Sequence, residues 1–207
     1  MNKNAFTLIE VLVTLAIIMI LVGALAGTGQ YLRTRSGIQL TTSTIRIIDA
    51  ALEQYHEQYK KYPFSNRIMM DGQNRPQPIE YTRVHLEADT GMTSITPNTT
   101  LVEKDGTCYA SSIGLYYFLD RGADSKAMLE TLSNRMITTL DAETGQHLKM
   151  VMGGKTYDLP RFVDAWGISL RYEYISKEVS AGNFYPYPKM MSAGPDKVFG
   201  TSDDLSN

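Results

Sequence analysis

The side chains best suited to chemistry are carboxylates near the end of the sequence, in the segment SAGPDKVFGTSDDL. Calcium takes about 6–8 oxygen ligands and combines carboxylates with backbone carbonyls. Asp196, Asp203 and Asp204 offer carboxylates from both ends of a short loop. Backbone carbonyls at two further positions could complete the set: Ala193 and either Gly200 or Thr201. The residue types fit either a calcium site or a solvated acidic turn.

Another acidic residue, Glu10, lies within an apolar stretch near the start of the chain. The segment VLVTLAIIMILVGALA follows it directly, and no Lys, Arg or Asp occurs from Phe6 to Leu32. A carboxylate in the middle of a membrane costs about 2.5–3.5 kcal/mol on insertion scales, so an unpaired one is expected to have a role. A glutamate near a membrane interface, where water reaches it, is the alternative interpretation.

The apolar stretch is long enough for a membrane-spanning helix, which needs about 20 predominantly apolar residues. The hydrophobic part of a secretory signal peptide is shorter, at about 7–15 residues. We therefore expect residues 6–32 to form a transmembrane helix that is closed by Arg33 and Arg35. Cleavage as in a secretory signal peptide is the alternative, because Gly23 and Ala26 are small.

The run Phe6-Thr7-Leu8-Ile9-Glu10-Val11-Leu12 resembles the class III signal of type IV pilins and type II secretion pseudopilins. The resemblance implies that residues 1–5 are a cytoplasmic leader. It also implies that a prepilin peptidase cleaves between Ala5 and Phe6, and that Phe6 is then N-methylated. In a filament, Glu10 of one subunit would neutralise the Phe6 amine of its neighbour and set the axial register. The family has Gly before the cleaved bond, where this chain has Ala5.

Helical periodicity continues beyond the apolar stretch. Apolar and aromatic residues recur at steps of three and four along one face: Ile45, Ile48, Leu52, Tyr55 and Tyr59. The opposite face is polar: Arg46, Asp49, Glu53, Glu57 and Lys60. Pro63 is expected to end the helix at Tyr62, because a residue before proline is biased out of the helical region. Residues 33–62 are therefore predicted to be the amphipathic part of a helix that begins at Phe6.

Residues 63–207 are predicted to form an extracytoplasmic head. We expect two helices, Ser111–Leu119 and Asp124–Ile137, the second with Met128, Leu129, Leu132 and Met136 on one side. We expect strands at Glu80–Leu86 and Ile168–Ile175, and a hairpin at Leu148–Leu159 that turns at Gly153-Gly154. A further strand is expected at Tyr185–Met191, at the edge of a sheet because it contains Pro186 and Pro188. The fold class is therefore predicted as α+β: a long N-terminal helix, transmembrane in its first half, packed on a small antiparallel sheet, as in pilins.

Further motifs are similar to those of the major pseudopilin. They are the helix end Tyr55–Pro63, the turn Asp164-Ala165-Trp166-Gly167 and the C-terminal loop, which looks like that protein's calcium loop. The loop departs from the family at Lys197, where Gly is usual; a residue with positive φ there would be strained, and its ammonium group opposes a metal ion. The resemblance implies a structural subunit of a type II secretion pseudopilus.

That resemblance also implies the location and the partners. The protein would be a single-pass protein of the inner membrane with a periplasmic head. Its partners would be prepilin peptidase, other pseudopilin subunits and the inner-membrane assembly platform. A type IV pilin acting in adhesion, motility or DNA uptake is the alternative, as is a minor pseudopilin at the filament tip.

Composition limits the other classes of function. The chain has 207 residues and a formal net charge of -2, so charge gives no sign of a nucleic-acid partner and none is expected. Cys108 is the single cysteine, so no intrachain disulfide can form, and a calcium ion would close the C-terminal loop instead. The sequence has no nucleophile elbow, phosphate loop or HExxH pair, and we expect no catalytic residues and no enzymatic activity.

Overall fold

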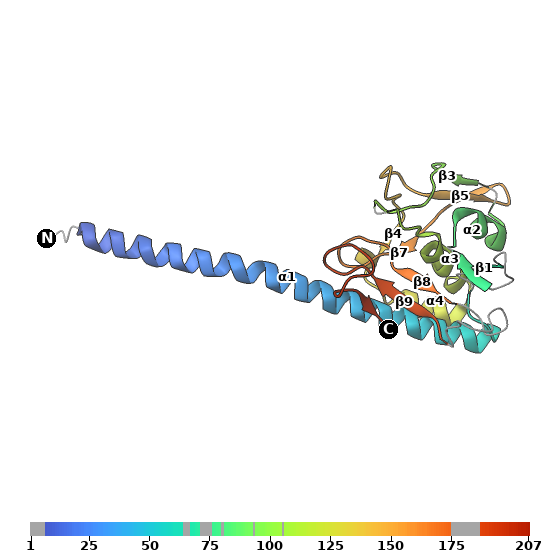
Figure 1. Ribbon diagram of the computed structural model, residues 1–207, viewed down its shortest axis with the longest axis horizontal. Coiled ribbons are helices and arrows are strands. Elements are labelled where there is room, and N and C mark those ends of the chain that lie inside the picture. Colours follow the sequence, from blue (N-terminus) through green and yellow to red (C-terminus); the bar gives the residue numbers. More distant parts are fainter. Residues whose placement is uncertain are drawn as a thin grey trace. The chain divides into compact units, whose positions relative to one another are not determined.

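The computed structural model describes residues 7–63, 67–70, 76–79, 81–92, 94–104, 106–174 and 187–207. The chain divides into two compact units, Met1–Gly37 and Ile38–Asn207. Helix α1, Leu8–Tyr59, supplies residues to both units (Figure 1). The fold is α+β, with a long N-terminal helix and small antiparallel sheets, as the sequence predicts.

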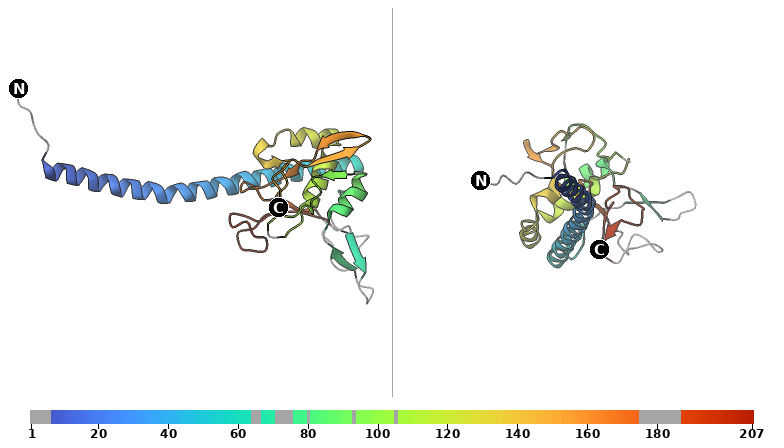
Figure 2. Two further views of the ribbon diagram at one scale, coloured as in Figure 1. Left: turned by 90° about the horizontal axis from the view of Figure 1, so that it is seen from above. Right: turned by 90° about the vertical axis from the view of Figure 1, so that its left-hand side faces the viewer.

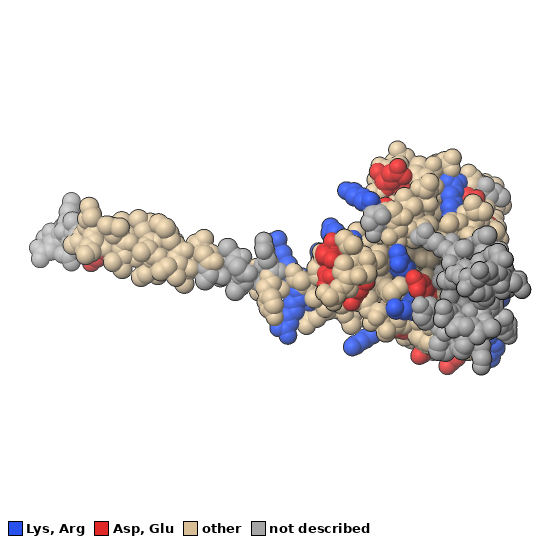
Figure 3. All heavy atoms as spheres, in the orientation of Figure 1, with Lys and Arg blue, Asp and Glu red and all other residues tan. Residues whose placement is uncertain are grey.

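In the first unit, α1 exposes its apolar side chains to the surroundings. The large apolar residues from Leu8 to Val22 are between 48% and 80% exposed. This stretch is almost entirely tan in Figure 3, because Glu10 is the one charged residue within it. Within the part of the chain that the structure describes, no helix combines the length and the apolarity that crossing a membrane requires.

Helix α1 ends earlier than the position of Pro63 led us to predict. The helix stops at Tyr59 rather than at Tyr62. Lys60 takes a left-handed conformation, with φ of 56°, and its N–H donates to the carbonyl of His56 at 2.8 Å. A left-handed residue directly after the last turn ends a helix by satisfying a free carbonyl. Lys60 therefore ends the helix, and Pro63 lies beyond its end.

The second unit contains two hydrophobic clusters, and helix α3, Ala110–Leu119, contributes to both. The first cluster joins the buried face of α1 to α3 and to the sheet residues near the C-terminus: Ile45, Ile48, Leu52, Tyr55, Leu115, Leu119, Phe162, Leu170, Tyr172 and Met190. The second lies under the other end of α3: Tyr81, Leu86, Ile95, Leu101, Tyr109, Ile113, Leu148 and Leu159. The predicted apolar face of α1 is thus confirmed up to Tyr55, while Tyr59 is 40% exposed.

Two predicted elements are wrong in type or length. The strand expected at Glu80–Leu86 is wrong, because its second half belongs to helix α2, Arg83–Thr90; Glu80 lies outside the described residues. Thr82 and His85 form a capping box at its start, and Leu86 and Thr90, one turn apart, are buried. The helix expected at Asp124–Ile137 is shorter, as α4 is Ala123–Leu129. A 3₁₀ turn, Asn134–Met136, and strand β4, Ile137–Thr138, follow it.

Within the described ranges, the strands form four small antiparallel sheets. The pairs are β1 (Arg67–Met70) with β2 (Pro76–Ile79), and β4 with β7 (Arg161–Phe162). The three-stranded sheets have the orders β3-β5-β6 (Ser94–Thr96, Lys149–Met152, Lys155–Asp158) and β10-β9-β8 (Leu205–Ser206, Lys189–Ser192, Arg171–Glu173). Figure 2 shows β1 and β2 as a ribbon at the periphery of the second unit.

The hairpin prediction is confirmed, because β5 and β6 meet at Gly153 and Gly154, both with positive φ. Strand β8 falls within the predicted Ile168–Ile175, although Ile175 lies outside the described residues. The edge position predicted for the strand at Tyr185–Met191 is wrong: β9 lies between β8 and β10. Pro188 comes just before β9 and so removes no ladder hydrogen bond, while Tyr185 and Pro186 lie outside the described residues.

Candidate functional site

At the N-terminus, Glu10 is held by Thr7 of its own chain. The Glu10 Oε2 atom accepts the Thr7 backbone N–H at 2.9 Å and the Thr7 hydroxyl at 2.8 Å. The Glu10 N–H in turn lies 3.4 Å from the Thr7 hydroxyl oxygen. This reciprocal pattern is a capping box, in which a threonine and a glutamate three residues later satisfy free donors at the start of a helix.

Glu10 therefore has a structural role that the sequence analysis missed. The T-x-x-E spacing of Thr7 and Glu10 before an apolar run was the available signal. Both hydrogen bonds from Thr7 to the carboxylate use Oε2, and a carboxylate has about four lone-pair positions, so it can accept a further donor. The predicted cleavage residues, Ala5 and Phe6, lie outside the described residues.

At the other end of the chain, the C-terminal loop, residues 193–204, begins with a close backbone approach. Gly194 has a φ of 69°, and a Cβ atom built on it would overlap the carbonyl oxygen of Asp203. The Asp196 N–H donates to Asp203 Oδ2 at 3.1 Å, and the Lys197 N–H donates to the Gly194 carbonyl at 3.2 Å. Lys197 has a φ of 65°, so the positive φ considered from the sequence is present.

The three aspartates of this loop accept hydrogen bonds from the loop itself. Asp196 Oδ1 accepts from the Val198 N–H at 2.9 Å. Asp203 Oδ1 accepts from the Thr201 hydroxyl at 2.6 Å, which lowers the pKa of Asp203. Asp204 Oδ2 accepts from the Gly200 N–H at 2.8 Å. The loop is therefore closed by its own donors.

The predicted calcium ligands are only partly brought together. Asp196, Asp203 and Thr201 are linked directly, and the Thr201 hydroxyl also lies 3.5 Å from Asp204 Oδ1. Ala193 is fully buried at the start of the loop. Among the described residues, no three His, Cys, Asp or Glu side chains gather so that they could hold a metal ion. The oxygen donors have the chemistry that calcium prefers, but they face N–H and O–H groups, so an ion would need these carboxylates to turn.

The turn after β7 fixes the position of this loop. Asp164 is buried, and its Oδ1 accepts the N–H groups of Trp166 and Ile168, both at 2.9 Å. Its Oδ2 accepts the Ser192 hydroxyl at 2.7 Å, and that hydroxyl oxygen accepts the Gly194 N–H at 3.1 Å. Burial raises the pKa of Asp164, and these hydrogen bonds oppose the rise. One buried carboxylate thus connects the Asp164–Gly167 turn to the loop.

A second contact links Asn207 to α1. The Asn207 side-chain amide donates to Asp49 Oδ1 at 3.0 Å and to the Pro188 carbonyl at 2.9 Å, while its Oδ1 accepts the Met190 N–H at 2.9 Å. Burial raises the pKa of Asp49 to about 6. Nothing in the sequence pattern distinguishes Asp49 from the other acids on the polar face of α1.

The comparisons with known proteins bear on the N-terminal segment. Residues 1–26 match the family described as the prokaryotic N-terminal methylation motif. Neither the comparison with curated proteins nor the comparison with solved structures found a match. The match covers the segment in which Glu10 caps α1 and the exposed apolar side chains follow. Residues 1–26 therefore carry the methylation motif that serves as the signal of type IV pilins and pseudopilins.

Proposed function

We propose that this protein is a structural subunit of a type II secretion pseudopilus. A prepilin peptidase removes residues 1–5, and the new N-terminus at Phe6 is methylated. The observation that carries the proposal is the methylation motif at residues 1–26. The major pseudopilin is the subunit that it resembles, through the turn Asp164–Gly167 and the C-terminal loop.

The first part of α1 supports this role physically. Its large apolar side chains from Leu8 to Val22 are exposed and have no core of their own. Burying a side chain of this kind contributes about 1.5–3 kcal/mol relative to leaving it in water. We propose that residues 6–32 lie in the inner membrane before assembly, with the head in the periplasm, and pack against neighbouring subunits in the filament. The assembly platform in the membrane would transfer the subunit from one environment to the other.

Glu10 is proposed to direct that assembly. Its carboxylate can accept a donor in addition to Thr7, and the methylated amine of Phe6 in an adjacent subunit would supply one. Two opposite charges in a medium of low dielectric constant are costly alone and tolerable as a pair. The subunit therefore needs no catalytic residue for this role, since its work is mechanical.

Processing is tested by intact-mass measurement after co-expression with prepilin peptidase. We expect loss of residues 1–5 and gain of one methyl group. Ala5→Gly should be cleaved at least as well, whereas Ala5→Leu, which is too large for a site that takes a small residue, should remain uncleaved. An uncleaved wild-type chain, or a product that begins after Ala26, would contradict the proposal.

The effects of deleting the gene distinguish the secretion role from the alternative functions. Deleting the gene of a major pseudopilin should block release of folded proteins into the medium and leave adhesion and motility intact. A type IV pilin would show the opposite pattern. A minor tip subunit would be required for secretion but would be present in purified filaments at a small fraction of the main subunit.

Calcium binding by the C-terminal loop is proposed as an additional property of the head. Its support is the chemistry of the donors, since Asp196, Asp203 and Asp204 lie in one short loop and Asp203 contacts the Asp196 backbone. A ligand that binds only the folded state stabilises it by about 2.7 kcal/mol at 100 times its dissociation constant. We therefore expect calcium to raise the melting temperature of the full chain in detergent relative to chelator, and Asp203→Asn to remove the difference. Equal melting temperatures with calcium and with chelator would refute it.

A further inference from the structure

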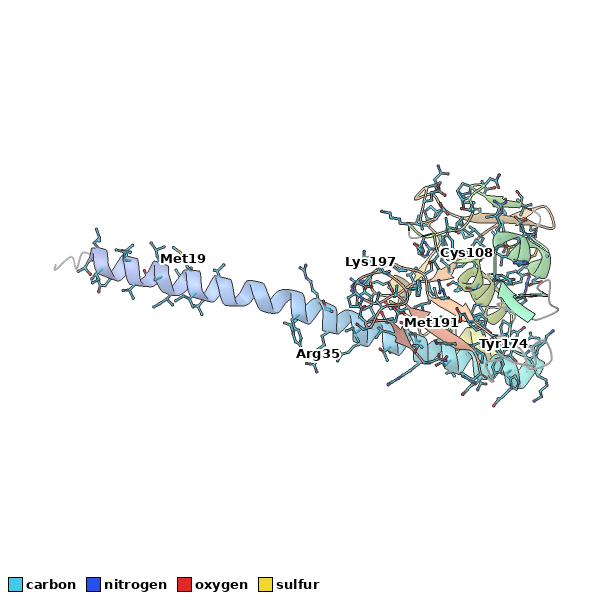
Figure 4. All side chains as sticks on the ribbon, viewed as in Figure 1. Met19, Arg35, Cys108, Tyr174, Met191 and Lys197 are labelled. Atoms are coloured by element: carbon cyan, nitrogen blue, oxygen red, sulfur yellow. The ribbon has the colours of Figure 1, made fainter. Side chains whose placement is uncertain are left out.

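The head contains a groove of about 760 Å³ that neither assembly nor the calcium proposal uses. Its walls come from parts of the chain that are distant in sequence: residues 103–104, 135–145 and 161–168, and Lys197. Figure 4 labels Lys197 on the C-terminal loop. The volume falls in the range of about 300–1,000 Å³ that is typical of ligand-binding sites.

The acidic residues of the groove are already neutralised or saturated. Glu103 is buried, and its Oε1 accepts from Arg161 at 3.0 Å and from the Ser169 hydroxyl at 2.6 Å. Asp141 is 2% exposed and accepts from the hydroxyls of Tyr109 and Thr99 and from the Thr144 N–H. Glu103 is therefore balanced by Arg161, and Asp141 is the one carboxylate of the described lining that keeps its negative charge without a cationic partner.

The basic residues of the groove are not neutralised in this way. Lys104, Arg135 and Lys197 are all exposed, and no ion pair among the described residues involves them. Arg161 is already paired with Glu103. The groove therefore presents an excess of positive charge to solvent, and the three cations come from three separate segments.

Apolar side chains line the same groove. Trp166 and Ile168 are half-buried, and Leu140 is 42% exposed. Tryptophan and arginine are enriched at protein interfaces, where a flat apolar surface and a charged group act together. A ligand that fits must therefore carry both negative charge and apolar groups.

Lys197 is held in place by the backbone of the C-terminal loop. It has a left-handed φ of 65°, which costs a residue with a side chain more than it costs glycine, and its N–H donates to the Gly194 carbonyl at 3.2 Å. Backbone strain of this kind persists where the rest of the structure enforces it and is concentrated at functional sites. Lys197 is one of the residues that line the groove.

We propose that this groove binds an acidic polypeptide segment of another protein, in which Asp or Glu alternates with apolar residues. Lys104, Arg135 and Lys197 pair with the carboxylates, and Trp166 and Leu140 pack against the apolar side chains. Cations from three separate segments fit carboxylates that are distributed along a chain better than they fit one compact anion. Basic clusters that recognise acidic peptides are a recurrent mode of binding.

Trp166 provides a direct probe, because it is the single tryptophan of the chain. The full chain in detergent micelles is titrated with a synthetic peptide that alternates Glu and Leu and contains no tryptophan. We expect a saturable change in Trp166 emission, and binding at least about ten-fold weaker for the same peptide with Gln in place of Glu. Binding of the peptide without a change in Trp166 emission would show that it binds outside the groove, and this result would overturn the proposal.

Variants separate the groove from general charge effects. Arg135→Gln and Lys197→Gly should each weaken binding by about ten-fold, and Lys155→Gln, an exposed lysine on β6, should change it less than about two-fold. Lys197→Gly should also raise the melting temperature, since glycine relieves the positive φ, so weaker binding cannot be attributed to loss of fold.

Four further results would overturn the proposal, and three of them concern binding. They are equal weakening by Lys155→Gln, equal responses to inorganic phosphate at the same ionic strength, and the absence of any saturable signal. A fourth is self-association of the full chain that the groove variants abolish while the peptide does not bind, because the occupant would then be a second copy of this chain.

Discussion

Glu10 and the aspartates of the C-terminal loop are carboxylates with similar partners in very different surroundings. Glu10 accepts from Thr7, three residues away, and Asp203 accepts from Thr201 and from the Asp196 backbone within the same loop. Around Glu10 the side chains are apolar and exposed, whereas the loop is anchored to buried residues of the head. The first carboxylate is set by neighbours in sequence, and the second depends on a folded framework.

The two regions differ in what they need from the rest of the chain. The N-terminal segment needs only a helix and a capped start, and it leaves its apolar surface available for other subunits. The C-terminal loop needs the Asp164 turn, Ser192 and the Gly194 approach to bring its two ends together. Mutations should therefore affect assembly in the first region and stability of the head in the second.

The largest expected effect is that of Glu10→Gln on filament assembly. Glutamine can still serve in the capping box, but it loses the charge proposed to pair with the Phe6 amine of a neighbour. Leaving one charge of a buried pair without its partner costs about 3–5 kcal/mol, so filaments should be undetectable by electron microscopy, while processing is unchanged. Thr7→Ala is the matched control: it removes the cap, costs about 1 kcal/mol of helix stability and should still allow filaments. Equal loss in both variants would assign Glu10 to capping alone.

The next largest effect is the loss of stability expected from Gly194→Ala in the C-terminal loop. The new methyl group would overlap the Asp203 carbonyl oxygen at a positive φ. We expect a loss of about 2–4 kcal/mol in the unfolding free energy of the full chain in detergent, measured by denaturant titration. Gly200→Ala is the control, because Gly200 also has a positive φ but no atom within 4 Å of its added Cβ; its cost should be about 1 kcal/mol. Equal costs would show that the close approach is unimportant.

A smaller effect on stability is expected from Asp49→Asn, at a position that the sequence pattern does not single out. The pKa of Asp49 is about 6 in the folded head against 3.8 as the ordinary value. A raised pKa means that Asp49 favours the fold below about pH 4 and that this contribution is lost as pH rises through 6. Asp49→Asn, which keeps an acceptor for Asn207, should therefore stabilise the protein on the order of 1 kcal/mol at pH 7, after allowing for solvent screening, and have little effect at pH 4.

Unfolding measured across this pH range tests the prediction. Glu57→Gln, an exposed acid on the same helix, controls for the loss of one negative charge. A stabilisation by Asp49→Asn that is independent of pH would contradict the assigned cause, since it would arise from packing or hydrogen bonding rather than from titration.

Much of the fold followed from short-range patterns. The apolar face of α1 at Ile45, Ile48 and Leu52, helix α3 and the Gly153-Gly154 hairpin are all confirmed. The wrong predictions concern segments whose local sequence is compatible with two different structures. Glu80–Leu86 alternates weakly as a strand, but the capping box of Thr82 and His85 selects helix α2. Pro186 and Pro188 suggested an edge strand, yet Pro188 precedes β9, which pairs on both sides.

The sequence by itself determined the N-terminal signal, the apolar stretch and the helical face of α1, because these depend on residues a few positions apart. Only the tertiary structure decided the partners of the loop aspartates, the raised pKa of Asp49 and the joining of Lys104, Arg135 and Lys197 in one groove. Those features arise from segments that are far apart in sequence. Burial and charge balance at such places depend on how the segments pack, and local periodicity carries no information about that packing.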